Sequence, residues 1–240
     1  RQMCIRDRFN GIHEGLVQSW KDIFPKKGEI HFAGALENNE DTGTLQYLAS
    51  TAMEAGFSTR VLDMQALDLQ NGRFFDPAGE LVNRCFKLYP WEWMVDESPD
   101  GCLAEMEWLE PIWKLVMSNK AILATLYELF PDSPYVLPCY LSRPRSGLFC
   151  KKPVFSREGH NVSVVDIRDW EEYVRIAETE GDYNTGAYVY QEYVEPTAYS
   201  GRYPVIGSWI IGGEAAGIGI RENRMEVTDN LSEFVPHIIG

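Results

Sequence analysis

Apolar residues in the first quarter of the chain recur at helical spacing and then in short continuous runs. The pattern predicts helix, strand, helix and strand in the ranges 9–24, 29–36, 39–56 and 57–64. A strand, a helix and a second strand in close succession are typical of a βαβ unit. The N-terminal part is therefore predicted to be an α/β lobe.

The middle of the chain changes from strands to helix. Two turns in 71–80 flank a predicted short strand, and 84–94 is predicted as a strand that runs into aromatic residues. A polar loop is expected at 96–101. Helical periodicity extends over 108–131, where Pro131 ends it. This stretch is predicted to be a central helical piece.

From about Phe149 onward the pattern indicates strands joined by short, glycine-rich turns. The predicted strands are 148–155, 160–167, 186–194, 204–213 and 214–221. The predicted fold class is α+β, with an N-terminal α/β lobe, the central helical piece and a C-terminal antiparallel sheet. The predicted organisation is a non-native leader at 1–8, an α/β lobe at 9–107 and a second region at 108–240.

The leader is predicted because "RQMCIRDR" at the start fits nothing that follows, and we expect the natural protein to extend upstream. The 240 residues carry a net charge of −14, which argues against nonspecific binding to nucleic acid or to an anionic membrane. No apolar run approaches the roughly 18 residues that cross a bilayer. Five scattered cysteines without CxxC spacing favour buried thiols in a reducing cytosol, so a cytoplasmic protein is expected.

Two adjacent lysines, Lys151 and Lys152, lie in a predicted strand, where neighbouring side chains point to opposite faces. Only one of them can reach a given ligand. A lysine turned inward requires an anion such as phosphate to offset its desolvation. The alternative is a solvated edge strand on which lysines discourage aggregation.

The polar loop at 156–161 follows these lysines. It offers the Ser156 hydroxyl, the Arg157 guanidinium and backbone N–H groups around Glu158 and Gly159. Such a loop can fold over phosphates, although a simple hairpin turn explains the same residues.

Two further cations occupy positions suited to an anion. Lys120 lies near the start of a predicted helix, where it opposes the helix dipole unless a bound anion is present. Arg221 lies at a strand end near Glu222 and Glu226, and its planar fork suits phosphate oxygens. An exposed lysine and a surface ion pair are the alternatives.

Polar residues at two other places offer binding groups. Gln191 and Glu192 lie in a strand that a linker to Pro196 follows, and such a linker can present its backbone to adenine. A polar edge strand is the alternative. Glu40 and Asp41 begin a helix, where they either cap free N–H groups or hold a cationic amine.

Six sequence blocks, in this order, resemble the ATP-grasp ligase domain of the glutathionylspermidine synthase family. The blocks are "FKLYPWEW", "WLEPIWKLVMSNKAIL", "KKPVFSREGHNVSVV", "YVYQEYVEP", "IGSWIIGGEAAGIGIRE" and "PHIIG". The resemblance extends from roughly Glu29 to the end, and is strongest to stand-alone bacterial members that lack an amidase domain. It implies an ATP-grasp fold, with 9–107 as part of a pre-ATP-grasp and substrate lobe and 108–240 as the nucleotide-binding region.

The resemblance implies roles for the cations. Lys120 and Lys152 would contact ATP phosphates, and the loop of Ser156, Arg157, Glu158 and Gly159 would close over them. Arg221, with Arg157, would stabilise charge during phosphoryl and acyl transfer.

The resemblance also implies positions for the remaining ligand groups. The adenine hinge would comprise Gln191, Glu192, Tyr193 and Val194. Glu226, Val227 and Thr228 would line the nucleotide site. Glu40 and Asp41 match the acidic pair that the family uses toward the polyamine and glutathione.

Three departures from the family pattern limit these implications. The Arg-x-Asp and Glu-x-Asn elements that bind Mg²⁺ in the family lie upstream of this sequence, so no metal ligand is assigned here. The glutathione-binding threonine falls near Trp93 and Met94, where no threonine occurs. The amidase domain is absent.

The function implied is an ATP-dependent carboxylate–amine ligase that forms an amide through an acyl-phosphate. Its acid would be glutathione or another peptide and its amine a polyamine, with Mg²⁺ as the metal, and this fragment is expected to be inactive alone. One alternative is a non-catalytic ATP-binding or regulatory module. A plain interaction domain would leave the lysines unexplained.

Overall fold

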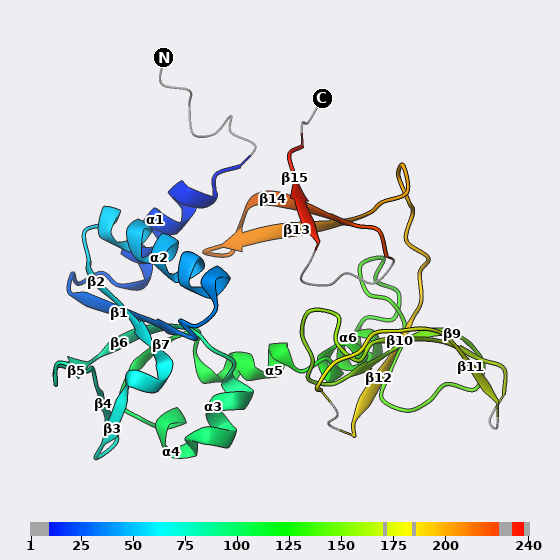
Figure 1. The fold of residues 1–240 in the computed structure, drawn as a ribbon, viewed down its shortest axis with the longest axis horizontal. Coiled ribbons are helices and arrows are strands. Elements are labelled where there is room, and N and C mark those ends of the chain that lie inside the picture. The colour runs from blue at the N-terminus through cyan, green and yellow to red at the C-terminus, as the bar shows by residue number, and fades with distance from the viewer. Residues whose placement is uncertain (1–9, 170–171, 184–185, 226–231, 238–240) are drawn as a thin grey trace. The chain divides into compact units, whose positions relative to one another are not determined.

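The structure is a computed structural model that describes residues 10–169, 172–183, 186–225 and 232–237 (Figure 1). The chain forms two compact units. Unit 1 comprises Arg1–Leu115 and Ser208–Ile218, and unit 2 comprises Val116–Gly207 and Gly219–Gly240. The leader proposed at 1–8 lies outside the described residues. Each unit is described by itself.

Unit 1 is built on a parallel sheet with the strand order β2-β1-β6-β7. The strands are β1 (Glu29–Gly34), β2 (Ser58–Asp63), β6 (Arg84–Leu88) and β7 (Glu107–Leu109). Helix α1 (Ile12–Ile23) precedes β1, and helix α2 (Asn39–Glu54) joins β1 to β2. The predicted βαβ unit is therefore confirmed.

The core of unit 1 lies where α1 and α2 pack on β1. Five of the six residues of β1 are buried, as expected for a central parallel strand that is covered on both faces. Trp20 packs edge-on against Phe32 at a ring-centroid distance of 5.5 Å, and its Nε1 donates a 2.8 Å hydrogen bond to Thr51 Oγ1. Gly34 permits the approach of α2, since a Cβ there would lie 2.9 Å from Leu45 Cδ1.

The segment after β6 differs from the prediction. The aromatic residues form helix α3 (Trp91–Glu97), and α3 and α4 (Pro99–Cys102) together occupy most of the expected loop at 96–101. Pro90 starts α3 with extended backbone, and Trp91 and Met94 bury the inner side of the helix. The prediction of a strand up to residue 94 was therefore wrong for Trp91 to Met94, because burial of these side chains favours a helix.

The predicted helix at 108–131 is broken into shorter elements. Its first residues pair with β6 as β7, and η3 (Ile112–Lys114), α5 (Leu115–Ser118) and α6 (Ala121–Leu129) follow. Pro111 precedes η3 and cannot donate a backbone hydrogen bond, which explains the break.

Two shorter segments of unit 1 complete its description. The 3-10 turn η2 (Met64–Ala66) follows β2. The predicted short strand at 71–80 is confirmed as β4 (Arg73–Phe75), which lies between β3 (Asp68–Gln70) and β5 (Leu81–Val82) in a small sheet.

Unit 2 contains an antiparallel sheet with the strand order β11-β10-β9-β12-β8. The predicted strands at 148–155, 160–167 and 186–194 are confirmed with shorter bounds, and β8 and β11 were not predicted. The strands are β8 (Cys139–Tyr140), β9 (Gly147–Pro153), β10 (Ser163–Ile167), β11 (Tyr173–Glu178) and β12 (Tyr188–Glu192). Ala124 of α6 packs with Cys139 and Val189 of this sheet.

A further sheet has the strand order β13-β14-β15. Strands β13 (Tyr203–Ile211) and β14 (Glu214–Asn223) match the predictions for 204–213 and 214–221, and each has residues in both units. Strand β15 (Glu233–Val235) was not predicted. The chain is thus a mixed α and β protein, as the sequence predicts.

The described cysteines, Cys85, Cys102, Cys139 and Cys150, are free thiols, and the first three are buried. Burial raises the pKa of Cys85 to about 12, so its reactive thiolate is scarce at neutral pH. The prediction of thiols without disulfides is confirmed for these four residues. Among the described residues, no helix is both long and apolar enough to cross a membrane.

Candidate nucleotide and amine sites

Lys151 and Lys152 make contacts with different residues of β12, as their alternation along β9 predicts. The Nζ of Lys152 donates a 2.7 Å hydrogen bond to Gln191 Oε1. The Nζ of Lys151 lies 3.9 Å from the ring centroid of Tyr188. Lys152 is directly opposite Val189, so it reaches diagonally along the face that Gln191 shares. Lys152 and Gln191 are therefore brought together.

Lys120 is the N-cap residue of α6, near the start of the helix as predicted, and it contacts the loop after β9. Its backbone N–H donates to Val154 O at 2.8 Å. Its Nζ donates to Ser156 O at 2.5 Å and to Ser156 Oγ at 3.0 Å. The two Ser156 oxygens thus contact the Lys120 ammonium group, which the dipole of α6 disfavours. A phosphate bound beside this loop would be attracted to the same ammonium group.

The loop at 156–161 has a defined turn structure. Glu158 and Gly159 have φ angles of 53° and 74°, in the left-handed region. Thr179 Oγ1 donates to Gly159 O at 2.5 Å, and the N–H of His160 donates to Arg157 O at 2.8 Å. These contacts hold the base of the loop. They are compatible both with a simple turn and with a loop that covers phosphates.

The proposed adenine hinge lies at the end of β12. Two of its backbone N–H groups are already used: that of Glu192 donates to Pro138 O at 2.8 Å, and that of Tyr193 donates to Leu148 O at 3.0 Å. Val194 follows beyond the strand and its side chain is exposed. Val194 is therefore the hinge residue best placed to offer its backbone to a base.

Arg221 lies in β14, directly opposite Phe234 of β15. Its guanidinium carbon is 5.7 Å from the centroid of the Phe234 ring. The neighbouring Glu222 pairs with Arg202 at 3.9 Å. The contact of Arg221 in the described residues is thus with Phe234 and not with Lys120 or Lys152. Glu226, Val227 and Thr228 lie outside the described residues.

Glu40 lines a cavity of about 850 Å³ in unit 1. The N–H of Glu40 is capped by Asn38 Oδ1 at 2.9 Å, so Asn38 caps α2. Asp41 is not one of the cavity's lining residues. These are Asn10, Ile12, His13, Glu14, Asn39, Glu40, Gly43, Thr44, Tyr47 and Trp209.

Aromatic and acidic groups meet in this cavity. His13 bridges Tyr47 and Glu54, with Nδ1 at 3.2 Å from the Tyr47 hydroxyl and Nε2 at 3.0 Å from Glu54 Oε2. Carboxylates beside aromatic rings suit an organic cation. Tyr47 and Trp209 could not be assigned from the sequence, because they are far from each other along the chain.

The described residues contain no cluster of side chains that would bind magnesium. No group of three or more His, Cys, Asp or Glu side chains among them could hold a metal ion.

Comparison with known proteins adds several relatives. A Haemophilus influenzae protein with the provisional name acid–amine ligase is 35% identical over 244 residues, which cover 97% of this chain and 62% of that protein. Trypanothione synthetase of Crithidia fasciculata is 28% identical over 236 residues, covering 86% of this chain and 35% of that protein. The bifunctional glutathionylspermidine synthetase/amidase of Escherichia coli is 26% identical over 266 residues, covering 96% and 42%. This chain thus spans less than two thirds of each relative.

A solved structure supports the fold. A Methylobacillus flagellatus protein with the provisional name gamma-glutamylcysteine synthetase matches with a TM-score of 0.60 at 10% identity, covering 95% of this chain and 75% of that one.

The model of the family "Glutathionylspermidine synthase preATP-grasp" matches residues 1–240. The chain therefore belongs to the glutathionylspermidine synthase preATP-grasp family.

Proposed function

We propose that this chain belongs to an ATP-dependent carboxylate–amine ligase, with ATP held by unit 2 and the amine by unit 1. The main support for the nucleotide site is the set of hydrogen-bond donors that unit 2 offers. Lys152 lies beside Gln191 and Lys120 beside Ser156, so two ammonium groups are fixed at a sheet and at the adjoining loop. The names of the relatives support a ligase.

The donor set fits a nucleotide. The lysines offer N–H donors to phosphate oxygens, and the end of β12 offers backbone groups to adenine. When bound, ATP would supply a phosphoryl group to a carboxylate oxygen, which can then leave as phosphate. The loop of Ser156, Arg157, Glu158 and Gly159 would exclude water from the activated acid. Arg157 and Arg221 would stabilise the negative charge that develops on the transferring group.

In the proposed step the amine attacks the carbonyl carbon of the acyl-phosphate, the C–O bond to phosphate breaks, and the amide, phosphate and a proton are formed. The acid is glutathione or another peptide, and the amine is a polyamine that binds beside Glu40. Asp41, the other member of the acidic pair, would act with Glu40 at the same end of α2. Mg²⁺ is proposed to be held by residues outside this sequence, so the 240 residues alone should bind ATP without turnover.

Release of ADP tests the ligase function. In a ligase-active protein that contains these 240 residues, ADP release should require an acid and a polyamine supplied together. ADP release that neither substrate increases would contradict the proposal and favour a non-catalytic ATP-binding or regulatory module.

Glu40→Gln should weaken spermidine binding about tenfold to a hundredfold, because it removes one charged hydrogen-bond acceptor. Isothermal titration calorimetry measures the affinity. Glu37→Gln is the matched control, since Glu37 is exposed and does not line the cavity. An equal loss in both variants, or no loss in either, would remove Glu40 from the amine site.

A further inference from the structure

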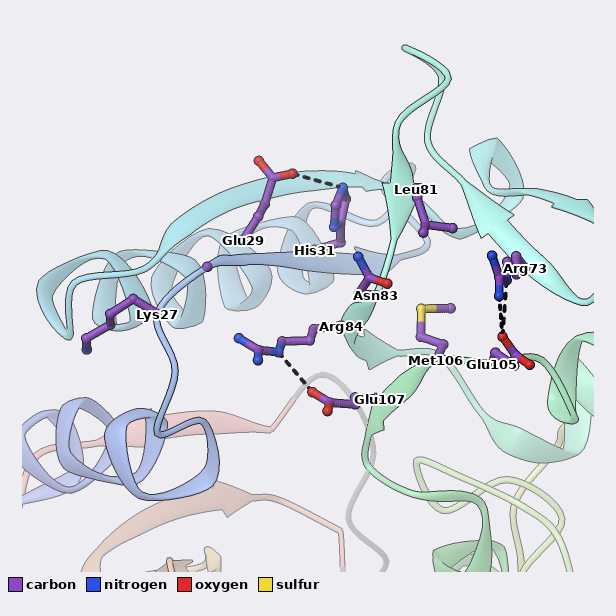
Figure 2. A pocket seen from close by; sticks show the side chains of 11 residues that line it. Lys27, Glu29, His31, Arg73, Leu81, Asn83, Arg84, Glu105, Met106 and Glu107 are labelled. Atoms are coloured by element: carbon purple, nitrogen blue, oxygen red, sulfur yellow. Dashed lines mark hydrogen bonds and ion pairs between the residues drawn. The ribbon is translucent and has the colours of Figure 1, made fainter.

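A second cavity of unit 1, of about 870 Å³, opens where strands of the parallel sheet begin (Figure 2). Glu29 and His31 of β1, Arg84 of β6 and Glu107 of β7 line it. The Glu40 cavity lies instead at the start of α2, which follows the carboxyl end of β1. The two cavities share no lining residue, so this one is a separate candidate site.

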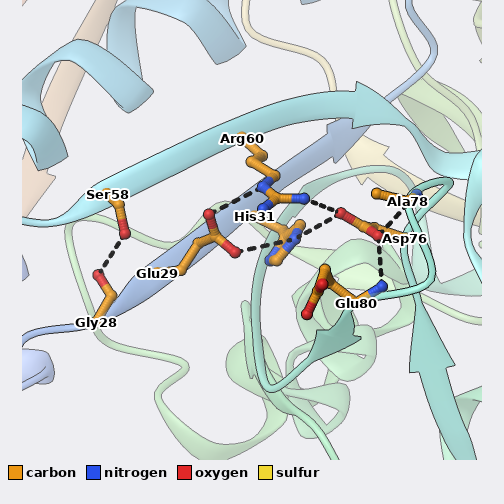
Figure 3. Close-up of polar contacts among 8 residues, drawn as sticks. All are labelled: Gly28, Glu29, His31, Ser58, Arg60, Asp76, Ala78 and Glu80. Atoms are coloured by element: carbon orange, nitrogen blue, oxygen red, sulfur yellow. Dashed lines mark hydrogen bonds and ion pairs between the residues drawn. The ribbon is translucent and has the colours of Figure 1, made fainter.

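His31 contributes a buried polar atom to this cavity. The residue is only 2% exposed, and its Nε2 has no hydrogen-bond partner in the part of the chain that the structure describes. Figure 3 shows the ring between two carboxylates, with Nε2 at 3.8 Å from Glu29 Oε2 and at 3.8 Å from Asp76 Oδ2. Both distances are too long for hydrogen bonds. Buried polar atoms in proteins are nearly always hydrogen-bonded, so a ligand is expected to contact Nε2.

The cluster around His31 lacks one positive charge. Arg60 Nε is 2.9 Å from Glu29 Oε1, and Arg60 also pairs with Asp76. Burial lowers the pKa of His31 and keeps the ring neutral at pH 7. Two carboxylates therefore share one guanidinium, and the cluster has a net charge of −1. Asp76 and His31 of this cluster are buried, which makes a compensating cation favourable.

The other cationic side chains that line the cavity make contacts outside the His31 cluster. Arg84 Nε is 2.9 Å from Glu107 Oε2, and Arg73 pairs with Glu105 at 2.9 Å. Lys27 donates to a backbone carbonyl and lies over Phe57. Each guanidinium has five N–H donors, so both arginines keep donors for an anion after these contacts.

We propose that this cavity binds a small zwitterion, with its ammonium group at Glu29 and His31 and its carboxylate at Arg73. An ammonium group has three donors and one positive charge. Two of the donors match the Glu29 oxygen and the orphaned Nε2, which accepts when Nδ1 carries the ring proton, and the charge is the one that the cluster lacks. The cavity is of a size that holds small ligands. Amino acids and short peptides have this chemistry.

Acid should weaken binding of the zwitterion. Glu29, Asp76 and Arg60 are the charged groups that face His31. Burial holds the pKa of His31 below its ordinary value of 6.5, so the ring is neutral at pH 7, and affinity should fall as acid protonates it. The imidazolium then supplies the missing charge and repels the ammonium group.

The test titrates the 240-residue chain with ω-amino acids of increasing length: glycine, β-alanine, 4-aminobutyrate and 6-aminohexanoate. The readout is the ¹⁵N chemical shift of the His31 ring, assigned by its loss in His31→Gln. At least one amino acid should bind at a concentration about tenfold below that needed for butylamine or butyrate. Absence of any shift, or equal binding of butylamine, would overturn the proposal.

Variants separate this site from the proposed amine site. Glu29→Gln and Arg73→Gln should each weaken amino-acid binding about tenfold, and Glu40→Gln should leave it unchanged. Arg73 lies in an exposed ion pair, so its replacement keeps the test valid if Glu29→Gln unfolds the chain. Loss of binding in Glu40→Gln, or full binding in Arg73→Gln, would overturn the proposal.

Discussion

Replacing Phe32 by alanine should lower the free energy of unfolding of unit 1 by about 3–5 kcal/mol, the range for removal of a large buried aromatic side chain. Phe32 is fully buried in β1. Its ring lies 5.5 Å from that of Trp20 and 5.7 Å from that of Phe86, so one substitution removes contacts to α1 and to β6. Urea unfolding followed by circular dichroism measures the change.

Phe130→Ala is the control for the stability measurement. Phe130 follows α6 and is 56% exposed, so its loss should change the free energy of unfolding by less than about 1 kcal/mol. If Phe32→Ala cost no more than Phe130→Ala, the packing described for unit 1 would be wrong.

Replacing Arg221 by alanine should lower kcat about 10²- to 10³-fold in a ligase-active protein that contains these residues. That is the scale for loss of one preorganised electrostatic donor. A group that stabilises charge only in the transition state affects turnover more than ATP binding. ADP release, with acid and polyamine supplied together, measures turnover.

Arg221→Lys should rescue turnover only in part, because a single ammonium group cannot reproduce the planar fork. Arg202→Ala is the matched control, since Arg202 pairs with Glu222 and Glu233 on the same sheet and has no proposed catalytic role. Unchanged turnover in Arg221→Ala, with much weaker ATP binding, would show that Arg221 only anchors the nucleotide.

Local sequence predicted the elements whose burial follows a simple period. The buried run in β1 and the periodicity of α2 were enough for the βαβ unit. Helix α3 was missed, because its burial of Trp91 and Met94 against other parts of unit 1 has no local signature. Tertiary packing decided between helix and the predicted strand at that point.

The candidate sites were likewise predicted only in part from local sequence. The alternation of side chains along a strand indicated that only one of Lys151 and Lys152 can reach a given ligand, and the helix dipole marked Lys120 as a position suited to an anion. Only the family resemblance assigned Lys152 and Lys120 to ATP. Tyr47, Trp209 and His31 were not predicted, because their cavities join residues from separate segments. The charge balance around His31 depends on Arg60 and Asp76, which the fold alone brings to the same place.

The adjacent lysines of β9 provide the most direct measurement of the central claim, that unit 2 binds ATP through one face of its sheet. Isothermal titration calorimetry with ATP compares the unmodified chain with Lys152→Met and Lys151→Met, which both keep the apolar part of the side chain. Lys152→Met should weaken ATP binding about tenfold to a hundredfold, and Lys151→Met, which changes the residue beside Tyr188, should leave it within about twofold. Equal affinities in the unmodified chain and in Lys152→Met, or an equal loss in the two variants, would contradict the proposed nucleotide site.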